Sequence, residues 1–179
     1  MGAPDVEDID PEEFEDLPST DVEVDRHIHF GMTGSFPLRL AELFFADDGL
    51  YIAQYAYITP MFGLAVGKHR REAKGMAAIY EIHGLDEVLL QADDVVWHSY
   101  ENVDRVLVYG GGALGRSKVA IHPKQGSVHA YRLHEDDIDL DDLTTDLESC
   151  GERGEFGVER RSGVGFSARR TLARFFGRE

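Results

Sequence analysis

The chain has 179 residues, 42% of them apolar, and carries 34 acidic against 18 basic side chains, a formal net charge of −16. This length suits one domain with tails, and the single cysteine, Cys150, excludes an intrachain disulfide and favours a reducing compartment. The acidic start has no basic-then-apolar leader, and the longest mostly apolar run, Ile58–Val66, is too short to span a bilayer. We therefore expect a cytoplasmic protein.

The negative charge is unevenly distributed along the chain. Residues 1–25 hold 11 acids and no base, residues 26–134 hold 11 of each, and residues 135–149 hold 8 acids and no base. Only 4 of the 18 basic residues are lysine, a composition typical of a halophile cytoplasm, where salt at 1 M screens charges over roughly 3 Å. The alternative is an ordinary protein with acidic interaction tails. Under both interpretations the balanced middle disfavours general nucleic-acid binding.

The first elements are an arm and three strands. Residues 1–24 are acidic and rich in proline, which predicts a disordered arm. Val22–Phe30 alternates as a strand does, with His27 and His29 on one face and Ile28 and Phe30 on the other. After a turn at residues 31–35, two further strands flank the turn signal Asp47-Asp48-Gly49. They are Leu38–Ala46 and Leu50–Tyr57.

A helical insert is expected over residues 60–92, divided by its glycines into two or three pieces. Strands then resume, and a helix with a leucine stripe closes the domain; its expected end is Gly151. The predicted strands are Asp94–His98, Val103–Tyr109, Lys118–His122 and Ser127–Leu133, and the helix is Asp139–Cys150. Residues 151–179 should form a glycine-rich linker and a short basic amphipathic helix, Ala168–Phe176.

Two adjoining stretches carry a resemblance to a known family. Leu85-Asp86-Glu87-Val88-Leu89-Leu90 ends the helical insert, a strand and a polar turn follow over Val95–Val103, and a second strand comes after them. This order resembles the prokaryotic pleckstrin-homology-like (PH-like) domains. The resemblance implies an α+β, mainly antiparallel fold over residues 25–150, a bent sandwich or partly open barrel closed by its C-terminal helix. It also implies binding, not catalysis.

The resemblance does not extend to recognition of inositol lipids. Members that bind phosphoinositides carry a basic pocket between their first two strands. The corresponding hairpin turn here is Asp47-Asp48-Gly49, which would repel a phosphate. We therefore expect no specific phosphoinositide binding and no cofactor.

Two motifs could carry chemistry. Gly110-x-Gly112-x-x-Gly115 matches a dinucleotide fingerprint, but the residues that follow look like a strand, so a hairpin turn is favoured over phosphate binding. His27-x-His29 places two imidazoles on one face of a strand, a spacing that a metal ion could use. The alternative is that these are partly packed strand histidines. Cys150 follows an acidic helix, which raises the pKa expected for its thiol and lowers its expected reactivity.

Two basic segments are candidates for partner binding. The first lies at the start of the helical insert and could bind an anionic partner, face solvent, or pair with the acidic arm. The second is the terminal helix, which could contact a protein, a second copy of the chain, a membrane surface or nucleic acid, or pack on its own domain. The candidate residues are Lys68, Arg70, Arg71, Lys74, Arg170, Leu172, Arg174, Phe175 and Phe176.

The sequence predicts a non-catalytic cytoplasmic binding or scaffolding module adapted to high salt, whose partner is a protein. One alternative is a small metal-binding protein or hydrolytic enzyme that uses the strand histidines. Another is an accessory protein that reaches a membrane surface or nucleic acid through the basic C-terminal helix.

Overall fold

The computed structural model describes residues 22–34, 37–58, 67–112, 115–134 and 138–163. These residues form eight strands, two α-helices and one short 3-10 helix. In chain order they are β1 (Val24–Thr33), β2 (Leu38–Ala46), β3 (Leu50–Ile58), α1 (Lys68–Gln91), β4 (Asp94–His98), η2 (Tyr100–Asn102), β5 (Val103–Tyr109), β6 (Lys118–Pro123), β7 (His129–Leu133), α2 (Leu140–Gly154) and β8 (Gly157–Arg161).

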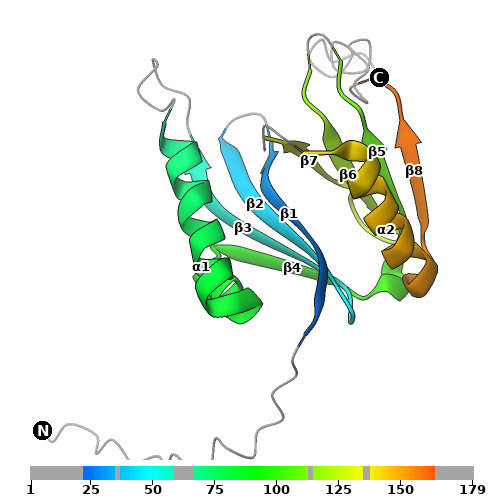
Figure 1. Ribbon diagram of the computed structural model, residues 1–179, viewed down its shortest axis with the longest axis horizontal. Coiled ribbons are helices and arrows are strands. Elements are labelled where there is room, and N and C mark those ends of the chain that lie inside the picture. The colour runs from blue at the N-terminus through cyan, green and yellow to red at the C-terminus, as the bar shows by residue number, and fades with distance from the viewer. Residues whose placement is uncertain (1–21, 35–36, 59–66, 113–114, 135–137, 164–179) are drawn as a thin grey trace, which may run out of the picture.

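All eight strands belong to one sheet in the order β4-β3-β2-β1-β7-β6-β5-β8. Every pairing is antiparallel except that of β8 with β5, which is parallel. The paired residues that join the two halves of the sheet are few: Gly31 pairs with Leu133 and Met32 with Arg132. Figure 1 shows α1 and α2 on opposite flanks of the strands. The expected fold class is confirmed: α+β, mainly antiparallel, with a helical insert after the first strands and a helix after the later ones.

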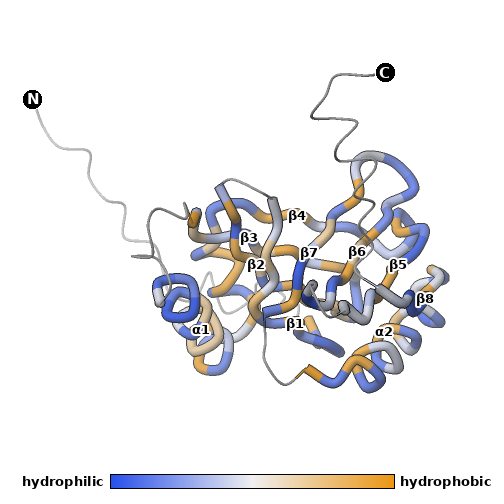
Figure 2. The backbone as a smooth tube through the Cα atoms, turned by 90° about the horizontal axis from the view of Figure 1, so that it is seen from above, coloured by the Kyte–Doolittle hydropathy of each residue, from blue (hydrophilic) through white to orange (hydrophobic). Residues whose placement is uncertain are grey.

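Two apolar cores lie on the two sides of β1–β3. The α2 core includes Ile28, Leu43 and Ile121 together with Leu143 and Leu147 of the helix. The α1 core lies on the other side of β1–β3. It contains Phe30, Leu40, Phe44, Tyr55 and Val88, among others. Seen from above, the apolar residues concentrate along the strands between the helices (Figure 2). Strand β2 alternates between the two cores, and seven of its nine residues are buried.

Helix α1 contains the expected break. Gly84 has φ 82° and ψ −169°, values that no helical residue adopts, and it divides the helix into two pieces. Ala73 and Met76 of the first piece and Leu85 and Val88 of the second are buried. Within the described chain, neither helix has the length and apolarity that crossing a bilayer would take.

Helix α2 begins as expected but ends later. Asp139 caps it by accepting hydrogen bonds from the backbone N–H groups of Asp141 (2.8 Å) and Asp142 (3.2 Å). The expectation that Gly151 ends the helix is wrong, because α2 continues to Gly154 and is capped by Glu155 in the left-handed conformation, φ 57°. Gly151 instead allows the backbone of Phe156 to come close to the helix, because a Cβ at this position would lie 2.7 Å from the Phe156 carbonyl oxygen.

The prediction of a linker after α2 is also wrong for the first part of that segment. Residues 157–161 form β8, whose backbone pairs with β5 from Arg105–Gly157 to Tyr109–Arg161. The alternation Val158, Glu159 within a short glycine-flanked run is too brief to signal a strand, so only its partner β5 defines it. The folded domain therefore extends beyond residue 150 to at least Arg161.

Candidate functional site

A β-bulge in β1 builds the candidate site. Ile28 pairs with Leu43 and Gly31 with Ala41, so His29 and Phe30 both stand opposite the single residue Glu42. Phe30 takes up the extra length with φ 56°. The prediction that Phe30 shares a face with Ile28 is therefore wrong, because the bulge turns it into the α1 core. The prediction that His27 and His29 share a face is confirmed, since both contact Glu42.

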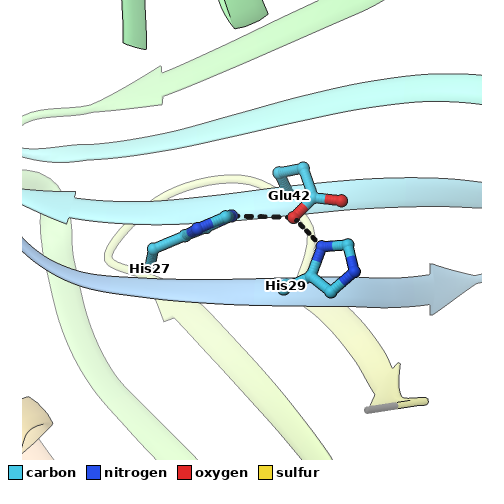
Figure 3. Close-up of side chains that lie close together, drawn as sticks. All are labelled: His27, His29 and Glu42. Atoms are coloured by element: carbon cyan, nitrogen blue, oxygen red, sulfur yellow. Dashed lines mark hydrogen bonds and ion pairs between the residues drawn. The ribbon is translucent and has the colours of Figure 1, made fainter. Parts of the chain in front are cut away.

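The side chains of His27, His29 and Glu42 converge between β1 and β2 (Figure 3). Glu42 Oε2 accepts hydrogen bonds from His27 Nε2 at 2.7 Å and from His29 Nδ1 at 2.9 Å. Glu42 Oε1 accepts from the Tyr55 hydroxyl at 2.5 Å. The side chain of Glu42 is fully buried, while those of His27 and His29 are 17% and 23% exposed. The carboxylate thus forms the floor of the site and the imidazoles form its walls.

Glu42 is held as a carboxylate. Burial alone would raise its pKa, but the hydrogen bonds from His27 and His29 and their positive charge outweigh burial and keep the pKa below its usual value. Burial, followed by the Glu42 charge, raises the pKa of Tyr55 well above its usual value, so this hydroxyl stays protonated and donates. The cluster is therefore one buried anion with side-chain donors on both oxygens.

Three ligand atoms of this cluster are close enough to share a metal ion. His27, His29 and Glu42 each offer one atom, and the three atoms lie within 4.8 Å of one another. Tetrahedral zinc with bonds of about 2.0 Å separates its ligand atoms by about 3.3 Å. The oxygen-to-nitrogen distances of 2.7 and 2.9 Å would have to open by about half an ångström to admit the ion.

Aromatic packing fixes the His27 ring. Phe44 stacks on it with a centroid distance of 4.3 Å and an interplanar angle of 12°, and Tyr80 of α1 meets it edge-on at 4.6 Å. The site opens into a cavity of about 350 Å³ beneath α1. Its lining comprises Arg26, His27, His29, Ala77, Tyr80 and Glu81. Glu42 is not among the residues that line this cavity, and its side chain is fully buried.

No local pattern in the sequence points to Glu42 as a member of this site. It lies 13 to 15 residues beyond the histidines, and only strand pairing brings it to them. The available signal was its chemistry, since it is the one acidic residue of β2, a strand that is otherwise almost entirely buried and apolar. A carboxylate at such a position requires donors nearby.

The other predicted site residues do not join this cluster. Lys68, Arg70, Arg71 and Lys74 lie in the first turns of α1 and are exposed, whereas Ala73 of the same turns is buried. Their role in partner binding stays a prediction. The remaining candidates belong to residues 164–179, outside the described part of the chain. They are Arg170, Leu172, Arg174, Phe175 and Phe176.

The glycine loop and the cysteine behave as the sequence indicates. Gly112 pairs with Gly115, and β6 begins at Lys118, so a strand follows where phosphate binding would need a helix N-terminus. Cys150 is buried in the α2 core, and burial raises the pKa of its thiol.

The rings of His98 and His129 lie 5.1 Å apart, and burial lowers the pKa of both.

Comparison with known proteins gives a likeness of fold. No family model matches the chain, and no curated protein matches it in sequence. Among solved structures, the chain is similar to the hSac2 domain from the human phosphoinositide phosphatase Sac2, with a TM-score of 0.50 and 12% sequence identity. The match covers 87% of this chain and 88% of that one. At this identity the likeness shows the fold alone.

Proposed function

We propose that this chain is a metal-binding module with a PH-like fold, which holds one divalent transition-metal ion between His27 Nε2, His29 Nδ1 and Glu42 Oε2. The observation that carries the proposal is the convergence of two imidazole nitrogens and one buried carboxylate oxygen within 4.8 Å of one another. Imidazole and carboxylate ligands suit zinc and its neighbours in the first transition row.

The surroundings of the cluster support metal binding in two ways. The ligands are held in place before any ion arrives, by the Phe44 stack on His27 and the Tyr55 hydrogen bond to Glu42, so little ordering is needed on binding. A divalent ion would also take over from the imidazole hydrogen bonds and charge in compensating the buried Glu42 carboxylate. The alternative role is purely structural: the hydrogen bonds would only fasten β1 to β2, and no ion would bind.

We assign binding, not catalysis, to this cluster. With Glu42 Oε2 bound to the ion and Oε1 accepting a hydrogen bond from Tyr55, the carboxylate has little capacity left to act as a base. A protein partner would follow from the PH-like resemblance. The acid-rich, lysine-poor composition supports work in a cytoplasm of high salt.

The test is calorimetric titration of zinc chloride into the full chain, purified with a chelator and dialysed. We expect one ion per chain, and a loss of affinity of about a hundredfold or more in His27→Ala and in His29→Ala. His122→Ala, on β6, is the matched control and should bind as the parent does. Absence of saturable binding by the parent, or equal binding by all three variants, would leave only the structural role.

A further inference from the structure

We infer that β4 is a docking edge for a second copy of this chain, and that the two β4 strands pair antiparallel across a two-fold axis at Val96. The residues involved are distinct from those of the proposed metal site, so the two proposals can fail separately. Three properties of β4 support this pairing: its position in the sheet, the apolar side chains that it exposes, and the complementarity of its sequence with itself.

Strand β4 lies at one end of the sheet, so one side of its backbone faces outward. Its five residues pair with β3 without a bulge, from Leu50–His98 to Gln54–Asp94. Helix α1 packs against β1 and β3, and over the described residues no strand pairs with the outer side of β4. Such an edge presents unpaired N–H and C=O groups that a strand of another chain can bind.

The two edges of the sheet differ in how they are protected. Strand β8, at the other edge, carries three charged side chains among its five residues, Glu159, Arg160 and Arg161. Charges of this kind discourage pairing with a second chain. The centre of β4 is instead Val95-Val96-Trp97, in which Val95 is 41% and Trp97 is 51% exposed. These two side chains lie on the same face of the strand, because side chains two residues apart do so.

The sequence of β4 is complementary to itself in one antiparallel register. When Val96 lies opposite Val96 of the second copy, Val95 lies opposite Trp97 and Asp94 lies opposite His98, and each of these pairs forms twice. A β-branched side chain opposite an aromatic one is a favourable cross-strand pair. The Asp94 carboxylate can accept a hydrogen bond from the His98 imidazole. Moving the axis to Val95 would place the charged Asp94 opposite Val96.

This pairing closes as a dimer, because the same five residues serve both copies. The formal charge of −16 on each chain opposes the contact. Salt weakens that opposition, since the screening length falls from about 10 Å at about 0.1 M ionic strength to about 3 Å at about 1 M. We therefore expect salt to strengthen the dimer, whereas salt weakens an interface that is held by ion pairs.

The experiment is sedimentation equilibrium of the full chain at several protein concentrations, in about 0.1 M and about 1 M sodium chloride. We expect a reversible equilibrium of monomer and dimer that shifts toward the dimer at the higher salt. Val95→Lys should raise the dissociation constant about tenfold or more, because each dimer contains the change twice and a charge replaces the apolar partner of Trp97. Val128→Lys is the matched control and should dimerise as the parent does, since Val128 is 50% exposed and lies outside the strands of the described structure.

A cysteine crosslink tests the register. Directly opposed residues of an antiparallel pair have Cα atoms about 4.5 or 5.5 Å apart, which suits a disulfide, so Val96→Cys should form a covalent dimer on mild oxidation. The two copies of residue 94 would lie about 14 Å apart along the strands, so Asp94→Cys should not form one. The native Cys150 is buried, which leaves the introduced thiol as the reactive one.

Three results would overturn this pairing. The first is a chain that stays monomeric at every concentration and at both salts. The second is a dimer that Val95→Lys leaves unchanged, because the contact would then lie elsewhere. The third is a crosslink in Asp94→Cys but not in Val96→Cys, which would exclude the register. Zinc binding by Val95→Lys should equal that of the parent, so a failure of the dimer leaves the metal site standing.

Discussion

Replacing Glu42 by glutamine separates the structural value of the cluster from its capacity to bind metal. The amide has nearly the shape of the carboxylate, and its oxygen can still accept from Tyr55. Its two N–H groups can donate to His27 Nε2 and His29 Nδ1 once those two ring nitrogens carry no proton. Each buried polar group then keeps a partner, and the cost of burying a charge disappears. We expect the free energy of unfolding of Glu42→Gln without metal to stay within about 1 kcal/mol of the parent.

The effect on metal binding should be far larger. Structural zinc sites with four ligands gain about 10–16 kcal/mol, or about 3 kcal/mol for each ligand, so losing one weakens binding about a hundredfold or more. At a zinc concentration of 100 times the parent dissociation constant, the parent gains about 2.7 kcal/mol of stability. For a chain of this size that corresponds to a rise in melting temperature of about 5–10 °C. The variant should show almost none of this rise.

The assay is thermal unfolding followed by circular dichroism, with and without zinc at that one concentration. Glu101→Gln, an exposed change in η2, is the control and should keep the full zinc-dependent rise. A Glu42→Gln variant that keeps the rise would show that this oxygen is not a ligand. A variant that loses more than about 3 kcal/mol in the absence of zinc would show that the charge itself holds β1 to β2.

Three further predictions concern stability. Burial raises the pKa of Tyr131 to about 12. The neutral Tyr131 side chain therefore contributes fully to the free energy of unfolding below pH 10.0, and this contribution declines as the pH rises toward 12. Tyr131→Phe should flatten this part of the curve of stability against pH. Asp139→Ala removes the cap of α2 and should cost about 1 kcal/mol in urea unfolding. Gly154→Ala places a Cβ 2.6 Å from Cβ and Cγ of Tyr100, which should cost about 1–3 kcal/mol by the same measurement, whereas Gly75→Ala, where a Cβ meets nothing within 4 Å, should cost nothing.

Local patterns predicted most strands well. The bounds of β2, β4 and β5 are those expected from alternation and from the turns beside them. The helical insert was also expected in pieces, and Gly84 provides the break. These features depend on residues close together in the chain, which is why a single sequence contains the information.

The site depended on information that is not local. The spacing of His27 and His29 indicated a shared face, but the third ligand is set by the register of β1 on β2. That register contains a bulge at Phe30, and no pattern in the sequence signals a non-glycine residue with positive φ there.

The prediction of where the domain ends failed for a related reason. Glycine after an amphipathic run usually ends a helix, but Gly151 lies inside α2, where the Phe156 carbonyl comes close. Whether a glycine ends an element or admits a neighbour depends on what packs against it. At Gly151 the neighbours are Phe156 and Val158, and Val158 belongs to β8, a strand that is defined by its parallel pairing with β5.

Strand β2 has a consequence for how this protein can evolve. Its alternate side chains belong to different cores, with Leu43 in the α2 core and Phe44 in the α1 core. A substitution at one position disturbs the packing of one helix, and a substitution at the neighbouring position disturbs the packing of the other helix. In a saturation mutagenesis experiment that selects for folded protein, these nine positions should therefore accept fewer amino acids than any other strand, and an insertion of one residue should be the least tolerated change of all.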